Sequence, residues 1–144
     1  MNPIIIRQPN QNDCGSVCLL SLIEFYGGEA SLERIRELSG TSKKGTTLLG
    51  LYQAAKALGF NAQGCDADMQ SLITHGKPLI LHVILEGKLE HYVVCYGYSK
   101  GVFTIGDPGQ GIITMTQIEL DNIWQTKTCL TLEPNEHFKL GKIN

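Results

Sequence analysis

A cysteine near the start of the chain stands between a polar turn and an apolar segment. Residues 8–15 are Gln-Pro-Asn-Gln-Asn-Asp-Cys-Gly, and apolar residues at helical spacing follow from Val17 onward. A thiol at the first turn of a helix meets the partial positive charge of the N-terminus, which favours the thiolate. The side-chain amide of Gln8 or Gln11 could donate a hydrogen bond to a carbonyl oxygen under attack. Cys14 is therefore predicted to be a nucleophile, which needs a base and a group that orients the base.

Four histidines compete for the role of base. His75 lies at the expected end of a helix, His82 lies in the middle of the apolar segment PLILHVIL, and His137 falls in a segment without periodicity. His91 instead follows the polar turn 86–90 and begins an expected strand, where a side chain can reach a cleft. His91 is therefore the predicted base.

Asp107 can orient His91 if the two strands expected within 92–106 pair as a hairpin. We expect a three-residue loop at 99–101 with glycine in its left-handed position. Counted from this loop, Asp107 lies opposite Val93, on the same side of the sheet as His91 and within side-chain reach. A shift of one residue would move Asp107 to the other face. The segment Asp-Pro-Gly is also an ordinary turn sequence, and both interpretations can hold together.

These residues predict acyl transfer. Cys14 attacks a carbonyl carbon, His91 accepts the thiol proton and returns it to the leaving amine, and Asp107 fixes the imidazole tautomer. The backbone N–H of Cys14 and one glutamine amide would hold the oxyanion, and spacing alone does not choose between Gln8 and Gln11.

The spacing of apolar residues, which indicates the elements that position these side chains, changes along the chain. The first third is helical and the remainder is mainly strands, which predicts an α+β domain with an antiparallel sheet. Asn12 or Asp13 is expected to cap the first helix. Expected helices are 14–26, 32–38, one from Thr46 or Thr47 to 58, a short one ending at Gly76, and 117–124; expected strands are 60–65, 78–85, 92–98, 102–106, 112–115 and 129–133. Residues 1–134 are expected to form the domain and residues 135–144 a tail or linker.

Charge, apolar runs and cysteine spacing argue against several kinds of function. The net charge is −2 and no basic run occurs, so nucleic-acid binding has no electrostatic support. The apolar segment 78–85 is far shorter than the ~20 residues that span a bilayer, and there is no signal peptide, so we expect a soluble chain that is not secreted by the usual route. Five cysteines without a Cys-x-x-Cys pair favour reduced thiols over disulfides and do not have zinc-ligand spacing.

The ordered set of motifs resembles the double-glycine leader peptidases, the papain-like cysteine peptidase domains at the N-terminus of bacterial ABC exporters for bacteriocins and peptide pheromones. The matching elements extend from about Ile5 to Leu132 and are Gln8…Asp13-Cys14-Gly15, Gly45-Thr46-Thr47, Ala67-Asp68-Met69, Gly87-Lys88-Leu89-x-His91-Tyr92 and Asp107-Pro108. In that family the oxyanion glutamine lies six positions before the cysteine, which implies Gln8.

The resemblance implies Cys14, His91, Asp107 and Gln8 as the catalytic residues, a papain-like fold, and no cofactor or metal. It also implies a precursor peptide whose amphipathic helical leader ends in Gly-Gly and is cleaved after that pair. The transmembrane and ATPase domains of an exporter would be further partners, and the chain would lie on the cytoplasmic side of the bacterial membrane as the N-terminal piece of a longer protein.

Two alternatives remain open from the residues alone. The same fold could bind a leader without cutting it, although a binding module has no need of the nucleophile Cys14. A papain-like acyltransferase or transglutaminase would use the same residues with an acceptor other than water.

Overall fold

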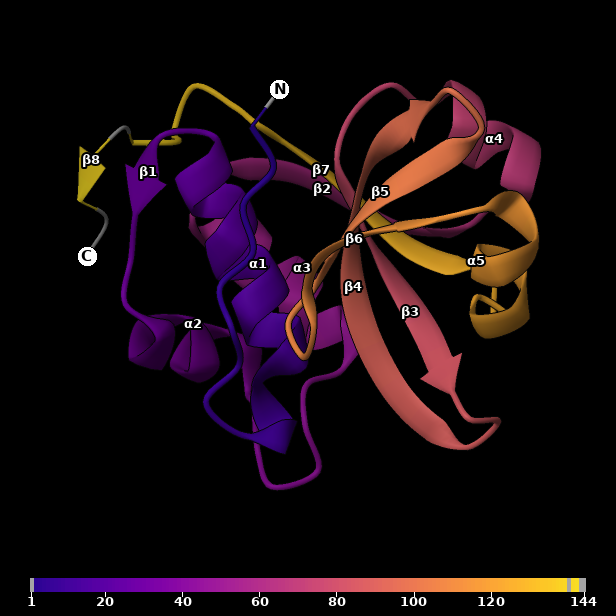
Figure 1. Ribbon diagram of the computed structural model, residues 1–144. Coiled ribbons are helices and arrows are strands. Elements are labelled where there is room, and N and C mark those ends of the chain that lie inside the picture. Colours follow the sequence, from indigo (N-terminus) through magenta and orange to yellow (C-terminus); the bar gives the residue numbers. More distant parts are fainter. Residues whose placement is uncertain (1, 140, 143–144) are drawn as a thin grey trace.

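The computed structural model describes residues 2–139 and 141–142, in which a helical layer packs on an antiparallel sheet (Figure 1). The helices are the 3-10 turn η1 (Gln11–Asp13), α1 (Cys14–Phe25), α2 (Leu32–Ser39), α3 (Leu48–Ala57), α4 (Met69–Thr74) and α5 (Gln117–Ile123). The strands are β1 (Gly28–Glu29), β2 (Phe60–Asp66), β3 (Leu79–Leu85), β4 (Leu89–Ser99), β5 (Val102–Asp107), β6 (Gly111–Met115), β7 (Thr128–Pro134) and β8 (Gly141–Lys142). The predicted α+β class is confirmed.

The main sheet has six strands in the order β2-β7-β3-β4-β5-β6, and every neighbouring pair is antiparallel. Figure 1 shows α1, α2 and α3 on one side of this sheet and α4 and α5 on the other. Because both faces are covered, the central strands are apolar on both faces, which explains the near-continuous apolar run in β3.

Most helices begin where the sequence predicts a capping side chain. Ser31, Thr47 and Asp68 each accept a hydrogen bond from a backbone N–H three residues further on. The start of α1 differs from the prediction. Asp13 holds the N-cap position, yet within the described part of the chain its side chain makes no capping hydrogen bond, and Asn12 does not occupy that position. The carboxylate of Asp13 has another partner, described below.

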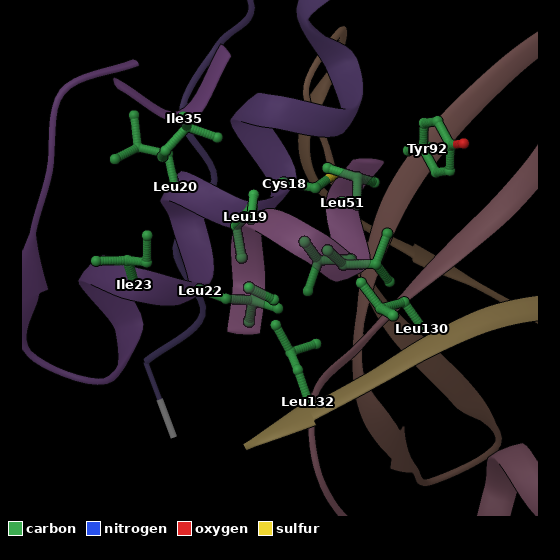
Figure 2. Close-up of a cluster of buried hydrophobic side chains, with 14 of the residues drawn as sticks. Cys18, Leu19, Leu20, Leu22, Ile23, Ile35, Leu51, Tyr92, Leu130 and Leu132 are labelled. Carbon is green, nitrogen blue, oxygen red and sulfur yellow. The ribbon is translucent and has the colours of Figure 1, made fainter. Parts of the chain in front are cut away.

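The helix that carries Cys14 is buried nearly all round. Every residue from position 14 to position 23 is buried, as expected for a helix enclosed by other elements. Figure 2 shows Leu19 and Leu22 of α1 in the same buried cluster as Leu51 of α3 and Leu130 of β7. Each fully buried leucine contributes about 1.5–3 kcal/mol of hydrophobic stabilisation. This packing fixes the position of the helix N-terminus.

A second cluster lies on the opposite face of the sheet, under α4 and α5. It includes Leu72, Leu120 and Trp124, and the Trp124 indole donates to the Thr128 carbonyl at 3.0 Å. The two clusters hold the sheet from both sides.

The turn between β4 and β5 corrects the predicted loop. Ser99 pairs with Val102, so the loop has two residues rather than three. Lys100 and Gly101 both have positive φ (54° and 85°), as a type I′ turn requires. A bulge between Cys95 and Gly97 then shifts the pairing by one residue.

Beyond the bulge the predicted register holds. Val94 pairs with Gly106, which places Asp107 next to Val93 in register. The shorter turn and the extra residue in β4 compensate each other, so Asp107 lies on the predicted side of the sheet.

The segment after Pro134 continues to contact the domain. The Asn135 N–H donates to the Gly59 carbonyl at 2.9 Å, and the Phe138 and Phe60 ring centroids lie 5.0 Å apart. The strand β8 pairs in parallel with β1, which the sequence did not predict. The boundary at residue 134 stays a prediction, and positions 140, 143 and 144 of the expected linker lie outside the described residues. No helix within the described residues is both long enough and apolar enough to cross a membrane.

Candidate active site

Cys14 is the first residue of α1, and its side chain is almost buried, at 8% exposed. The residue after it, Gly15, is closely packed, so an added Cβ would require neighbouring side chains to move by a few tenths of an ångström. A Cβ on Gly15 would lie 3.2 Å from side-chain carbons of both Leu51 and Tyr92 and 3.3 Å from the Thr46 Cβ. The close approach of these three side chains confines the surroundings of the thiol.

His91 and Asp107 form a buried hydrogen-bonded pair. The distance from His91 Nε2 to Asp107 Oδ1 is 2.8 Å, and the two residues are 7% and 4% exposed. Since Nε2 is bonded to Asp107, Nδ1 is the nitrogen that remains for Cys14. The structure thus brings together three residues that the sequence predicts to act together.

The environment of His91 favours its protonated form. Burial lowers the pKa of His91, but the hydrogen bonds to Asp107 and Cys14 and the negative charge of both groups outweigh burial and raise the pKa to about 9. At neutral pH His91 is therefore a cation beside Cys14.

Asp107 remains ionised in this buried position. Burial raises the pKa of Asp107, but the bonds from His91, the Gly109 N–H and Gln110 outweigh it, so the pKa falls below its ordinary value. The Gly109 N–H and Gln110 Nε2 donate to the carboxylate at 2.8 Å and 3.1 Å. The Asp-Pro-Gly segment is therefore both a turn and a support for the carboxylate.

Gln8 lies beside the turn that follows Asp107. Its backbone N–H donates to the Pro108 carbonyl at 3.0 Å, and its Nε2 donates to the Asn10 carbonyl at 2.9 Å. An amide nitrogen carries two hydrogens, so one remains to donate elsewhere. Its Oε1 is buried without a hydrogen-bond partner among the described residues. Gln11, the other candidate, is exposed.

A charged pair that the sequence did not predict lies next to the nucleophile. Asp13 is 0% exposed, and Arg36 of α2 binds its carboxylate with two nitrogens, Nε donating at 2.7 Å and Nη2 forming the second bond. This pair fixes the residue before Cys14 to α2. The position of Asp13 in the motif was visible, but its partner lies 23 residues away and no local pattern indicates it.

Hydroxyl groups connect the first turn of α1 to the loop before α3. Thr41 Oγ1 hydrogen-bonds with Ser16 and Ser39 at 2.8 Å each, and with Thr46 at 2.5 Å. This network holds Thr46 beside Gly15. It was also not predicted, because it joins α1 to the end of α2 and the loop that follows α2.

The other histidines lie elsewhere. His82 Nε2 is 3.1 Å from Glu90 Oε1, and its ring lies 5.2 Å from the Tyr92 ring, so it neighbours the site without belonging to the buried pair. His75 and His137 are exposed.

Comparison with known proteins gives the family. Residues 3–137 match the model of the Peptidase C39 family. The lactococcin-G-processing and transport ATP-binding protein LagD of Lactococcus lactis subsp. lactis is 36% identical over 137 residues, which cover 94% of this chain and 19% of LagD. The transport/processing ATP-binding protein ComA of Streptococcus pneumoniae is 36% identical over 139 residues, with the same coverage of 94% and 19%. The chain thus spans about a fifth of the length of these relatives.

Two solved structures are similar over nearly the whole chain. The peptidase domain of Streptococcus ComA, a bi-functional ABC transporter involved in a quorum-sensing pathway, has 36% identity and a TM-score of 0.86, covering 93% of this chain and 100% of that one. A double glycine motif protease from an AMS/PCAT transporter, in complex with the leader peptide, has 28% identity and a TM-score of 0.83, covering 91% of each chain. The papain-like fold and the resemblance predicted from the motifs are confirmed: the chain belongs to the Peptidase C39 family, a family of cysteine peptidases.

Proposed function

We propose that this chain is a cysteine endopeptidase that removes the leader from a precursor peptide by cutting after a Gly-Gly type pair. The observation that carries the proposal is the buried pair of His91 and Asp107 beside Cys14 at a helix N-terminus. The proposed roles are nucleophile for Cys14, base and acid for His91, orienting carboxylate for Asp107 and oxyanion donor for Gln8.

The reaction proceeds by acyl transfer through the sulfur. The Cys14 thiolate attacks the carbonyl carbon of the second glycine, and the oxyanion accepts hydrogen bonds from the Cys14 N–H and Gln8 Nε2. Each such donor lowers the barrier by about 2.7–4 kcal/mol. His91 protonates the departing amine, and the leader remains bound as a thioester. His91 then deprotonates a water molecule that hydrolyses the thioester and frees the leader carboxylate.

The names of the relatives support this substrate class. LagD and ComA are described as processing and transport proteins, and the similar protease structure holds a leader peptide. By the same argument we propose that the chain works with the membrane and ATPase domains of an exporter, on the cytoplasmic side of the membrane.

A groove beside the start of α3 suits an amphipathic leader. It has a volume of about 470 Å³ and is lined by Leu48, Leu49, Tyr52, Gly64, Cys65, Asp66 and Thr128. Leu49 is 63% exposed at this groove, so a partner that covers it would bury apolar surface. We propose that the apolar face of the leader helix packs here.

The register of the sheet connects this groove with Cys14. Tyr92 pairs with His82 across β4 and β3, and Thr128 pairs with Asp66 across β7 and β2. β3 and β7 pair as far as Leu81 and Cys129, and continuing this register by one residue brings the two pairs into one row across the sheet. The end of the leader would follow this row to the Tyr92 ring beside Cys14, and residues without a Cβ fit best at so confined a place.

The direct test is cleavage of a synthetic precursor with an amphipathic leader that ends in Gly-Gly. We expect the wild type to release the leader after the pair and the Cys14→Ala variant to give no product. Mass spectrometry of the products identifies the bond that is cut.

A matched control is Cys18→Ala, one helical turn further along α1. Cys18 is 0% exposed, and burial raises its pKa well above the ordinary value, so its thiol is inert. We expect this variant to keep cleaving. Binding of the precursor by the wild type without any product would favour the binding-module alternative. An amine adduct in place of the free carboxylate would favour an acyltransferase.

A further inference from the structure

Two cysteines outside the active site face each other across neighbouring strands. Cys65 of β2 and Cys129 of β7 are register partners, and their sulfur atoms lie 3.2 Å apart. Both are free thiols. Directly opposed residues in an antiparallel pair have Cβ atoms about 4.5–5.5 Å apart, close to the spacing of about 3.5–4.5 Å in a disulfide. Only a small movement therefore separates the dithiol from a bonded pair.

The two thiols differ in access. Cys65 is half-buried on β2, the strand at the edge of the sheet. Cys129 is 1% exposed and belongs to the cluster under α4 and α5. The pKa of Cys129 is raised to about 12, mainly by burial and to a smaller extent by the hydrogen bond to Cys65. A reagent from solution therefore meets Cys65 first, while Cys129 is held beside it.

We propose that Cys65 and Cys129 form a dithiol modification site, separate from Cys14, that a low-molecular-weight disulfide such as oxidised glutathione converts to an intramolecular disulfide. The Cys65 thiolate attacks one sulfur of oxidised glutathione, which gives a mixed disulfide and one reduced glutathione. Cys129 then loses its proton to solvent, attacks the Cys65 sulfur and displaces the second reduced glutathione. The protein loses two hydrogens, and one oxidised glutathione becomes two reduced ones.

The remaining cysteines lack this arrangement. Cys18 and Cys95 are 0% and 1% exposed, so a reagent does not reach them. Cys14 lies on α1 and its neighbouring groups are those of the active site. A Cys65–Cys129 bond would tie the edge strand β2 to β7 and join residues 64 positions apart, which restricts the unfolded chain and raises the melting temperature.

The test uses the Cys14→Ser chain, so that the nucleophile does not compete for the reagent. The protein is incubated with oxidised glutathione, alkylated with iodoacetamide and digested with trypsin. Cys65 is the sole cysteine of the fragment 57–88, and Cys129 is the sole cysteine of 128–139. We expect these two fragments to be linked by a bond that dithiothreitol breaks, and the melting temperature to rise by several degrees.

Two further variants in the same background serve as controls. Cys65→Ser should abolish both the linked fragments and the rise in melting temperature, whereas Cys95→Ser should keep both. The proposal is overturned if Cys65 and Cys129 are alkylated after the incubation, or if the linked fragments contain other cysteines. Because neither measurement uses peptidase activity, the result does not depend on the proposed function.

Discussion

The charge state of His91 depends on Asp107. The pKa of His91 is raised to about 9, above the ordinary value of about 6.5 in an unfolded chain. Protonated His91 therefore stabilises the fold fully below pH 6.5, and this stabilisation is lost as the pH rises toward 9. The pKa of Asp107 is lowered instead. Ionised Asp107 therefore stabilises the fold at pH values above the ordinary pKa of an aspartate, and this stabilisation is lost as the pH falls through the lowered pKa.

Replacing Asp107 with Asn should remove the stabilisation that depends on His91. Without the carboxylate, the pKa of His91 falls, because only Cys14 still opposes the effect of burial, so less of the imidazole is protonated at pH 7. We expect the wild type to lose about 2 kcal/mol of unfolding free energy between pH 6 and pH 9.5, and Asp107→Asn to lose much less. Cleavage should fall about 10²-fold or more, because the imidazole loses its orientation and is less protonated.

Urea denaturation at the two pH values and the cleavage assay measure these effects. Gln110→Ala is the control, since it removes one hydrogen bond from Asp107 and leaves the charge. It should keep the wild-type dependence on pH. If Asp107→Asn kept that dependence too, another group would be responsible.

Residues whose role is visible in the local sequence could be predicted. Residues whose role depends on a contact with a distant part of the chain could not. Cys14 stands at a helix start, as periodicity predicts. His91 was expected to begin its strand, but β4 begins at Leu89, so His91 is the third residue of β4 and pairs with Val83. The choice of Gln8 needed the spacing of a known family. Arg36 could not be predicted, because its ion pair with Asp13 depends on how α2 packs against α1.

At the scale of elements, the pairing of β4 with β5 rests on two deviations from regular structure. The predicted loop was wrong, but the predicted position of Asp107 was right. The turn is one residue shorter than expected, and the bulge adds one residue to β4, so the two differences cancel. A bulge is not visible in an apolar segment such as Tyr92-Val93-Val94-Cys95-Tyr96, where inward and outward positions do not alternate in polarity. Strand positions were therefore predictable here, and the irregularity between them was not.

Gly97 should be necessary for this bulge. Its φ is 149°, a backbone conformation that residues with a Cβ rarely adopt, and a Cβ placed there would meet nothing within 4 Å. Gly97→Ala therefore adds backbone strain without a collision. We expect a loss of about 1–3 kcal/mol of unfolding free energy, measured by urea denaturation.

Gly64→Ala provides the comparison within the same sheet. Gly64 lies in β2 without a positive φ, and its added Cβ would make only an ordinary contact of 3.4 Å with Leu48. We expect this variant to remain within about 0.5–1 kcal/mol of the wild type. Equal stabilities of the two variants would show that the bulge tolerates a side chain.

At the scale of the whole molecule, the proposed leader groove and the nucleophile occupy separate places on the sheet. The groove lies at the start of α3, near the edge strand β2. Cys14 lies beside β4, which is three strands away from β2 in the order of the sheet. The two sites are connected by the row that contains His82 and Tyr92. A leader that reaches Cys14 along this row would contact residues on both layers, so substrate binding and bond cleavage depend on different parts of the molecule.

Leu49→Gln separates these two parts, because Leu49 lines the groove and none of the predicted catalytic residues is among the residues that line it. Burial of a leucine by the leader contributes about 1.5–3 kcal/mol, which corresponds to a factor of about ten or more in affinity. We expect Leu49→Gln to raise KM for a precursor with a full leader by about tenfold and to leave kcat nearly unchanged. Steady-state kinetics gives both constants, and titration of the Cys14→Ala chain with the precursor gives the affinity without turnover.

Ile118→Gln is a closely matched control. Ile118 and Leu49 are each the second residue of a helix capped by a threonine, and they are 76% and 63% exposed. Ile118 lies on α5, on the opposite side of the sheet, so Ile118→Gln should change neither KM nor affinity (Figure 1). Equal effects of the two substitutions would reflect a general response to loss of apolar surface. A fall in kcat at constant KM for Leu49→Gln would show that the leader does not bind in this groove, even if the enzyme cleaves after Gly-Gly.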